Sequence, residues 1–348
     1  MKKLIYPAVL LVLIGCKKPE PEVPVPGDFE NGVVILNEGL FQQNNATISF
    51  YSNETQTASQ QVFQTVNGRG LGDTANDLAL FEQNDKKYFV VAVDVSSQLE
   101  IVEANTMKSV RQIPLFDDGT PRSPRAVAVT DDKIYACNFD GTVSVIQLTS
   151  LTEIATINVG ANPDGICVQN NKLYLSNSGG LNAPDYDSTI SVIDINADTV
   201  LTEITARINC RSMIAGLNDD VYVLSSGDYA GVGPAFLRID AVADTVVEEV
   251  ALNVGPWTYV DGWIYYVDLD LNGVYRYNTL THLFENNQLI DCSGFLTPYA
   301  IQHTGDYIFM SDANNYVNSS TIRCYDPAGA FQYEFTAALN AKEFVFND

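Results

Sequence analysis

A tyrosine-bearing segment recurs at regular intervals along the chain, and this repeat constrains the fold more than any other feature. Six such tyrosines follow one another at intervals of 39 to 48 residues. A repeat of about 40–45 residues is typical of β-propellers, in which each repeat folds into one four-stranded blade. The six residues are Tyr88, Tyr135, Tyr174, Tyr222, Tyr265 and Tyr307.

Each repeat has the same internal order of strand-like segments. In one repeat, a short apolar segment (125–131) precedes the tyrosine segment, an alternating segment (142–148) follows it, and a more polar segment (152–160) ends the unit. Apolar and polar residues alternate in these segments, and Gly, Asn, Asp or Pro separates them, which indicates β-strands. No stretch after the N-terminal region has a convincing helical period. The sequence therefore predicts an all-β chain.

The first unit lacks an inner strand. Residues 32–40, 47–53 and 60–66 are predicted to be its second, third and fourth strands, but the proline-rich stretch before them cannot donate ladder hydrogen bonds. Residues 341–348 resemble an inner strand without a blade of its own. Pairing the two ends would close the ring and protect the sheet edges. We predict a seven-bladed β-propeller over residues 31–348, closed by its C-terminal strand, with six or eight blades as alternatives.

The N-terminus has the features of an export signal. Lys2 and Lys3 precede an apolar run over residues 4–14, which is shorter than the ~20 residues that span a bilayer but suits a signal peptide. The following Gly15-Cys16 completes a segment that resembles a bacterial lipobox. This resemblance implies a signal peptide over residues 1–15 and lipidation of Cys16; an ordinary signal peptide that ends near a cysteine is the alternative.

The segment after Cys16 is expected to be a spacer. Residues 16–30 contain four prolines and no apolar periodicity, which is typical of an extended, semi-rigid linker. We expect the protein to contact a membrane through its lipid anchor alone.

Composition limits the classes of partner. A formal charge of −24, with 46% hydrophobic residues, is that of a globular protein whose acidic surface would repel nucleic acid. The odd set of cysteines after Cys16 has no CxxC spacing, so a zinc site built from cysteines is not predicted. We interpret these cysteines mainly as small buried apolar residues, and one disulfide stays open.

Candidate ligand-binding residues lie in two sets of predicted loops at one end of the propeller. These are the loops between blades and the loops between the second and third strands. Their arginines and aromatic side chains are not needed for turning, whereas inter-blade salt bridges and turn formation are the structural alternatives. The candidates are Phe41, Arg69, Asp73, Asn76, Arg122, Arg125, Asn138, Asp164, Asn177, Tyr186, Arg211, Tyr229, Trp257, Asp268, Tyr299, Asp312 and Tyr316.

Signals of catalysis are weak. The chain has two histidines, His282 and His303, and no HExxH, GxSxG or P-loop motif. Asp268 and Asp270 could hold calcium, but their spacing matches no EF-hand and favours a solvated turn. We predict no catalytic residue, no metal site and no cofactor, and we expect the protein not to be an enzyme.

Two parts of the sequence resemble known propeller families. Residues 124–160 and 163–195 resemble YVTN-type, surface-layer-like propellers. Residues 35–39 and 68–77 resemble propeller lipoproteins of Bacteroidetes, a group that includes cobalamin-scavenging surface lipoproteins. This resemblance implies a monomeric lipoprotein of the outer membrane that faces the cell exterior. It would bind cobalamin or a related corrinoid on the propeller face and pass this small molecule to a TonB-dependent transporter.

One departure from that pattern concerns orientation. Such surface lipoproteins carry an acidic cluster directly after the lipidated cysteine, whereas here Lys17 and Lys18 precede Glu20 and Glu22. The inner and outer leaflets therefore both stay open. A protein–protein scaffold or adhesin is the alternative function, and a lactonase or quinoprotein-like enzyme is a third.

Overall fold

The structure, a computed structural model, describes residues 29–347. The predicted signal peptide, Cys16 and nearly all of the spacer lie outside these residues. No helix within 29–347 combines the length and the apolar character needed to cross a bilayer.

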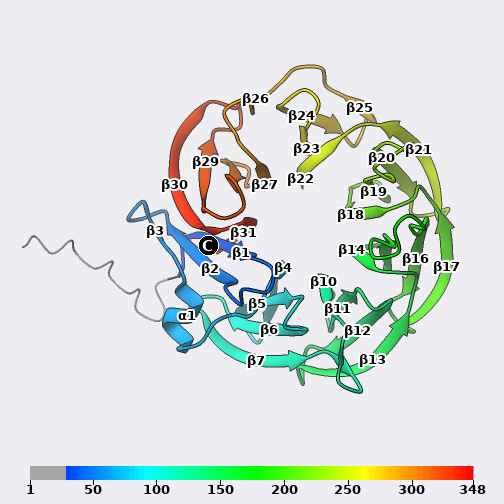
Figure 1. Cartoon of the computed structure of the whole chain (residues 1–348), viewed down its shortest axis with the longest axis horizontal. Coiled ribbons are helices and arrows are strands. Elements are labelled where there is room, and N and C mark those ends of the chain that lie inside the picture. Colours follow the sequence, from blue (N-terminus) through cyan, green and yellow to red (C-terminus); the bar gives the residue numbers. More distant parts are fainter. Residues whose placement is uncertain (1–28, 348) are drawn as a thin grey trace, which may run out of the picture.

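Seven antiparallel sheets surround a central channel, which confirms the predicted seven-bladed propeller (Figure 1). From the channel outward, blade 1 contains β31 (Ala341–Asn347), β1 (Gly32–Asn37), β2 (Thr47–Ser52) and β3 (Thr57–Ser59). Blade 2 contains β4 (Ala75–Gln83), β5 (Lys86–Val93), β6 (Gln98–Glu103) and β7 (Lys108–Pro114). Blade 3 contains β10 (Pro124–Val129), β11 (Lys133–Asn138), β12 (Thr142–Gln147) and β13 (Thr152–Asn158).

The remaining blades repeat this order. Blade 4 contains β14 (Pro163–Gln169), β15 (Lys172–Asn177), β16 (Thr189–Asp194) and β17 (Thr199–Thr205). Blade 5 contains β18 (Cys210–Ala215), β19 (Asp220–Ser225), β20 (Ala235–Asp240) and β21 (Thr245–Ala251). Blade 6 contains β22 (Val254–Val260), β23 (Trp263–Asp268), β24 (Gly273–Asn278), β25 (Leu283–Phe284) and β26 (Ile290–Asp291). Blade 7 contains β27 (Pro298–His303), β28 (Ile308–Asp312), β29 (Ser319–Tyr325) and β30 (Phe331–Leu339). A small hairpin, β8 (Phe116–Asp117) and β9 (Thr120–Pro121), connects blades 2 and 3.

The C-terminal strand closes the ring, as the sequence predicts. β31 pairs antiparallel with β1 from Gly32↔Asn347 at one end to Asn37↔Ala341 at the other. Blade 1 is thus built from both ends of the described chain, and its inner strand is the last strand of the sequence. The closure leaves no inner strand without a partner.

The prediction of a fourth strand over residues 60–66 is wrong. The fourth strand of blade 1 is the shorter β3, and the predicted segment instead forms the helix α1 (Val62–Asn67). Val62 and Phe63 are buried and Val66 packs beside them, so the apolar residues lie on one face of a helical turn. Three apolar residues in seven fit either a strand or a short helix, and packing against blades 1 and 2 decides between them.

One hydrophobic cluster fills each of the seven interfaces between neighbouring blades. The interface between blades 7 and 1 has its own cluster, in which Phe309 and Ile322 pack with Ile35 and Phe344. The cysteines at positions 137, 167, 210, 292 and 324 are all buried and unpaired. They act as small apolar residues, as interpreted from the sequence.

Polar contacts also connect blades 3, 4 and 5. Lys133 and Tyr135 of blade 3 both contact Asp198 of blade 4, at 2.9 Å (Nζ to Oδ2) and 2.7 Å (OH to Oδ1). Lys172 and Tyr174 of blade 4 contact Asp244 of blade 5 in the same way. Two of the six repeating tyrosines, Tyr135 and Tyr174, therefore join their own blade to the following one.

Candidate functional site

A β-bulge interrupts the start of the inner strand in all seven blades. A bulge inserts an unpaired residue and redirects its side chain, and bulges are frequent beside functional sites. Here the inserted residues line the channel near the end at which the inner strands begin, which we call the mouth. They are Asn76, Arg125, Asp164, Arg211 with Ser212, Gly255 with Pro256, Tyr299 and Lys342.

The channel behind the mouth is large enough to receive part of a ligand. Its volume is about 720 Å³, and all seven inner strands contribute to its wall. Small-molecule sites in proteins commonly measure about 300–1,000 Å³. The bulges therefore place seven sets of side chains around one cavity of suitable size.

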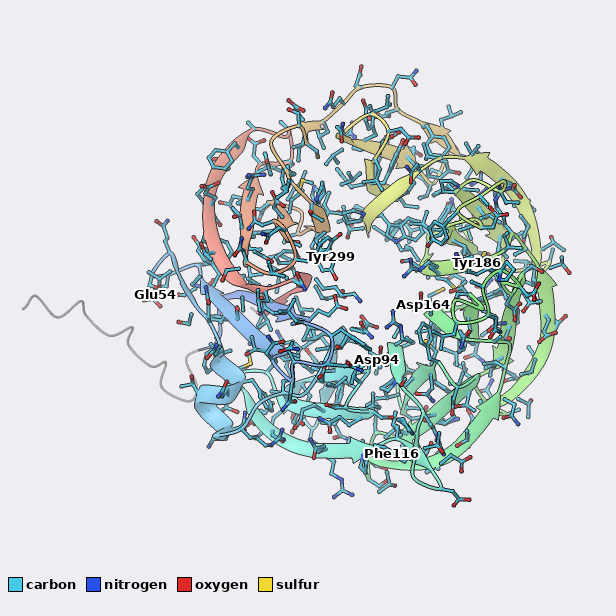
Figure 2. All side chains as sticks on the ribbon, viewed as in Figure 1. Glu54, Asp94, Phe116, Asp164, Tyr186 and Tyr299 are labelled. Carbon is cyan, nitrogen blue, oxygen red and sulfur yellow. The ribbon has the colours of Figure 1, made fainter. Side chains whose placement is uncertain are left out.

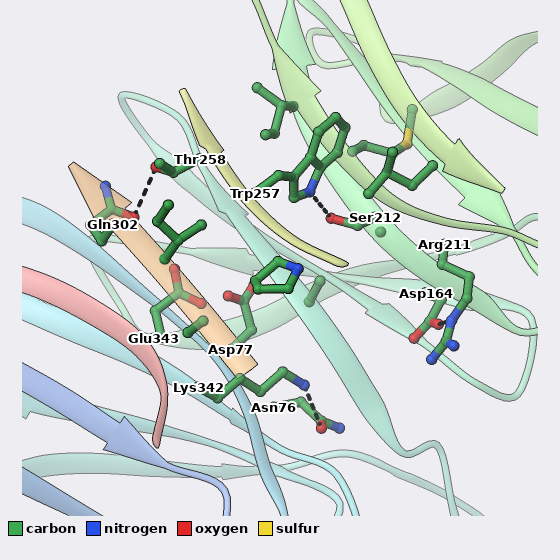
Figure 3. Close-up of a pocket in the computed structure, with 18 of the residues that line it drawn as sticks. Asn76, Asp77, Asp164, Arg211, Ser212, Trp257, Thr258, Gln302, Lys342 and Glu343 are labelled. Atoms are coloured by element: carbon green, nitrogen blue, oxygen red, sulfur yellow. Dashed lines mark hydrogen bonds and ion pairs between the residues drawn. The ribbon is translucent and has the colours of Figure 1, made fainter. Parts of the chain in front are cut away.

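A continuous chain of polar contacts runs around the mouth from blade 1 to blade 5. Figure 3 shows the contacts at its two ends, Lys342 with Asn76 and Arg211 with Asp164. Lys342 Nζ donates to Asn76 Oδ1 at 3.1 Å, and Asn76 Nδ2 donates to Asp94 Oδ2 at 3.1 Å. Arg125 then bridges Asp94 (Nη1 to Oδ2, 2.7 Å) and Asp164 (Nε to Oδ1, 2.9 Å). We call this set, which ends at Arg211, the polar arc.

Asp164 is the centre of the polar arc. Arg211 Nε lies 3.0 Å from its second oxygen, so the buried carboxylate holds a guanidinium group on each side. Burial alone would raise the pKa of Asp164, but the charges of Arg125 and Arg211 outweigh it and lower this pKa below its ordinary value. Asp164 is therefore a carboxylate at neutral pH and fixes both arginines.

Tyr299 continues the polar rim in blade 7. Its hydroxyl donates a hydrogen bond to Glu38 Oε2, in the loop that follows β1. Burial, followed by the charge of Glu38, raises the pKa of Tyr299, so the hydroxyl keeps its proton and remains a donor. Tyr316 packs edge-on against the Tyr299 ring, with 5.8 Å between centroids.

Blade 6 leaves an apolar gap in this rim. Its bulge consists of Gly255 and Pro256, and neither offers a polar side-chain atom. Trp257 lies beside them in the channel wall and donates from Nε1 to Ser212 Oγ at 2.7 Å, which fixes the indole (Figure 3). The mouth thus combines a charged and amide-bearing arc with an apolar side carrying an aromatic ring.

A pair of carboxyl groups lies deeper in the channel. Asp77 on β4 and Glu343 on β31 share a side-chain hydrogen bond, and both line the cavity (Figure 3). Burial, followed for Glu343 by the charge of Asp77, raises the pKa of both groups. Asp77 also accepts from the backbone N–H of Val127 at 2.7 Å. Its charge is stabilised by this bond, so we assign the shared proton to Glu343.

Exposed apolar side chains surround the mouth on the loops above it. Phe41, Leu181, Tyr229 and Leu296 are each about 70% exposed, at 67%, 72%, 71% and 70%. Tyr186, labelled in Figure 2, packs edge-on against Tyr229 with 6.4 Å between centroids. Large apolar groups exposed around one cavity are typical of a contact surface.

The predicted candidates fall into separate places. Asn76, Arg125, Asp164, Arg211, Trp257 and Tyr299 line the channel. Phe41, Tyr186, Tyr229 and Tyr316 lie on the loops above it. Asp268 lines a second pocket between blades 5 and 6.

Two predicted arginines make ion pairs outside the channel. Arg69 contacts the fully buried Glu100 of β6, with 2.7 Å between Nη2 and Oε1. Arg122 contacts Glu153 of β13 at 2.5 Å and also donates to Ser144. Inter-blade salt bridging, the structural alternative considered for the loop arginines, instead describes Arg125 and Arg211, which both pair with Asp164 of blade 4.

Four further candidates stabilise loops or strands. Asn138 and Asn177 each donate to a serine on the neighbouring strand, Ser144 and Ser191 respectively. Asp73 accepts from the backbone N–H groups of residues 42 and 44, and Asp312 accepts from those of residues 296 and 297. These contacts hold the loops that carry the rim.

Asp77, Lys342 and Glu343 belong to the site but are absent from the predicted set. A signal for them exists in the sequence, since Lys342 and Glu343 occupy the inner strand predicted at residues 341–348. Their position in the channel depends on the bulge and on the pairing of the two ends, which a single strand does not show.

The arrangement presents fixed polar groups around the opening of the channel. Within residues 29–347, no three His, Cys, Asp or Glu side chains are grouped to hold a metal ion. The charged groups of the polar arc pair with one another, which gives fixed donors and acceptors around the opening. Fixed polar groups with an aromatic wall can orient a large amphipathic molecule.

Solved structures with the same fold include several propellers. A quinoprotein alcohol dehydrogenase-like protein from Bacteroides thetaiotaomicron is 18% identical, with a TM-score of 0.67 over 92% of this chain and 79% of that one. A protein from Bacteroides uniformis named as a candidate 6-phosphogluconolactonase is 13% identical, with a TM-score of 0.65 over 91% of this chain and 100% of that one. A protein of unknown function from Desulfotomaculum acetoxidans is 16% identical, with a TM-score of 0.64 over 91% and 100%. At these identities the likeness is one of fold.

Sequence comparison identifies the family. No curated protein matches the sequence. The family model DUF5074, described as a domain of unknown function, matches residues 31–284, which include β1 to β3 of blade 1, the whole of blades 2 to 5 and most of blade 6. The chain therefore belongs to the DUF5074 family.

Proposed function

We propose that the protein captures a corrinoid, cobalamin or a close relative, at the mouth of its channel. A corrinoid is a broad molecule with a largely apolar ring and a fringe of amides. Such a ring would lie against Trp257 and the apolar gap of blade 6, while its amides would meet the polar arc. The combination of polar arc and apolar gap around one channel is the observation that carries the proposal.

The rigidity of the mouth supports tight capture. Asp164 and Arg125 link the four consecutive blades 2 to 5, so the donors and acceptors are ordered before a ligand arrives. Ordering side chains on binding costs about 0.5–1.5 kcal/mol for each flexible side chain, and a preformed rim avoids much of this cost.

Isothermal titration calorimetry with cyanocobalamin tests the proposal. We expect one molecule to bind per chain with micromolar or tighter affinity. In a Lys342→Met variant, the loss of a donor that faces the channel should weaken binding by about 1–2 kcal/mol, or roughly tenfold. The matched control is Lys108→Met, which removes an exposed lysine from the outer strand β7 and should leave binding unchanged. No heat with the intact protein would exclude the proposal.

The position of the first described residues bears on membrane attachment. The described chain enters β1 at Gly32, which pairs with Asn347 at the end of the ring opposite the mouth. A lipid on Cys16 would therefore attach the propeller to the membrane at the end opposite the mouth and leave the mouth accessible. We propose an outer-membrane location in which a TonB-dependent transporter receives the corrinoid.

The exposed apolar rim is the surface that would contact such a partner. It also favours the second candidate, a protein-binding scaffold at the cell surface without a small ligand. Pull-down from solubilised outer membranes, with and without cyanocobalamin, separates the two. Corrinoid transfer requires cyanocobalamin binding, whereas a scaffold would retain its partner without it. Both proposals assign binding rather than catalysis to the protein.

A further inference from the structure

A second cavity of about 250 Å³ lies between blades 5 and 6, separate from the channel. It exists because the outer strand of blade 6 is broken. β25 pairs with β24 at Tyr277 and Asn278, β26 pairs with it at Gly273 and Val274, and the chain between them leaves the sheet. The middle of β24 is therefore not covered by a continuous strand. The walls of the cavity include Val250, Leu252, Tyr266, Tyr275 and Phe284.

Aromatic rings form more than one side of this cavity. The Tyr266 ring is perpendicular to that of Phe284, with 6.0 Å between centroids, and lies 6.2 Å from that of Tyr275. Tyr266 is 4% exposed, whereas Tyr275 and Phe284 are partly exposed. Aromatic rings present a negative face, which attracts cations.

The same wall carries a carboxylate without a cationic partner. Asp268 is 5% exposed, and its Oδ1 accepts from the backbone N–H groups of Asp270 and Leu271, both at 3.0 Å. Within residues 29–347, its Oδ2 has no hydrogen bond and no Lys, Arg or His forms an ion pair with it. A second acidic residue, Glu285, is neutralised by Arg276 at 2.6 Å. Burial, followed by the charge of Asp268, raises the pKa of Tyr266, so the negative field of Asp268 extends into the aromatic wall.

We infer that this cavity is a binding site for a small organic cation, an amine on an apolar ring or short chain. The ammonium group would lie between Asp268 and the tyrosine rings, and the apolar part would contact Val250, Leu252 and Phe284. A volume of about 250 Å³ suits a ligand of this kind and is too small for a corrinoid. The site is independent of the proposed function, since it shares no residue with the channel wall.

Titration with 2-phenylethylamine, followed by ligand-observed NMR and calorimetry, tests the inference. 2-Phenylethanol has the same shape without the charge. We expect the amine to bind at least about tenfold more tightly than the alcohol, because cation–π and carboxylate contacts are absent for the alcohol. Cyanocobalamin should not change the affinity for the amine.

An Asp268→Asn variant identifies the site. The asparagine oxygen can still accept the two backbone hydrogen bonds, so the loop should fold, while the negative charge is lost. We expect binding of the amine to weaken about tenfold and the melting temperature to change little. Asp270→Asn is the matched control in the same loop, outside the cavity wall, and should leave binding unchanged.

Four results would overturn the inference. The first three are equal affinity for the amine and the alcohol, unchanged amine binding in a folded Asp268→Asn variant, and equal weakening in Asp270→Asn. Binding of a lysine-containing peptide without binding of 2-phenylethylamine would also contradict it, since the site would then recognise a protein.

Discussion

Asp164 shows how one residue can both stabilise the fold and shape the site. It is buried and contacts a guanidinium group from each neighbouring blade. An Asp164→Asn substitution leaves Arg125 and Arg211 without their shared counter-charge. Removing one partner of a buried ion pair typically costs about 3–5 kcal/mol, and the partial exposure of Arg211 places the expected loss near the lower value, about 3 kcal/mol. Urea denaturation at pH 7 measures it; an unchanged free energy of unfolding would contradict the described role.

The same residue predicts a dependence on acid. Because the folded protein lowers the pKa of Asp164, its carboxylate stabilises the fold above the ordinary pKa of about 4 and loses this effect as the pH falls further. The intact protein should therefore lose more stability between pH 6 and pH 3 than Asp164→Asn does. Denaturation curves across this range give the two slopes, and parallel curves would be inconsistent with this account.

Glu343 predicts the opposite dependence. Its pKa and that of Asp77 are raised, so the folded protein binds protons more tightly than the unfolded chain. Stability is then highest at low pH and falls as the pH rises above about 4 and through the raised values. Glu343→Gln keeps a hydrogen-bond donor for Asp77 and should be more stable than the intact protein at pH 8, by about 1 kcal/mol or more.

The melting temperature as a function of pH tests this expectation. Glu82→Gln, an exposed glutamate on the same inner strand as Asp77, is the matched control and should follow the intact protein. A Glu343→Gln protein that is less stable than the intact protein at pH 8 would show that ionisation of the Asp77–Glu343 pair does not destabilise the fold.

At the scale of the elements, strand order and ring closure could be predicted from the sequence because both depend on local alternation and on counting repeats. The bulges could not, since a bulge is a property of pairing between two strands. Prolines precede three of the inserted residues, at Pro124, Pro163 and Pro298, and are the one local sign of them. The exact alignment of the repeats could not be predicted either. The positions equivalent to Tyr135 and Tyr174 are Val90 in blade 2 and Phe309 in blade 7, each two residues from the tyrosine of that repeat.

The closing strand carries an element-scale prediction. Deletion of residues 341–348 removes every pairing partner of β1 on its inner side, the packing of Phe344, and the channel side chains of Lys342 and Glu343. We expect the truncated protein to melt at least about 5 °C lower, because several kcal/mol are lost and each lowers the melting temperature of a domain as large as residues 29–347 by roughly 1–2 °C. Addition of a peptide of residues 341–348 should restore part of the loss. An unchanged melting temperature would contradict the role of β31 in closure.

At the scale of the whole molecule, the ring brings together residues that lie far apart in the sequence. Closure of the ring by β31 brings Lys342 of blade 1 beside Asn76 of blade 2, and Asp164 joins two arginines from different blades. The sequence placed most channel residues in the correct loops, because repeats put equivalent loops at one end. It did not separate channel residues from Arg69 and Arg122, because their partners Glu100 and Glu153 lie on strands that only the fold brings near.

Hydrogen–deuterium exchange with and without cyanocobalamin tests the proposed claim that a corrinoid binds across the mouth. The mouth loops, such as residues 177–188, 226–232 and 313–318, should exchange more slowly when the ligand is bound. The loops at the opposite end, such as residues 195–198 and 241–244, should exchange at the same rate in both states. Slower exchange at that opposite end, or no change at the mouth under saturating cyanocobalamin, would contradict the claim.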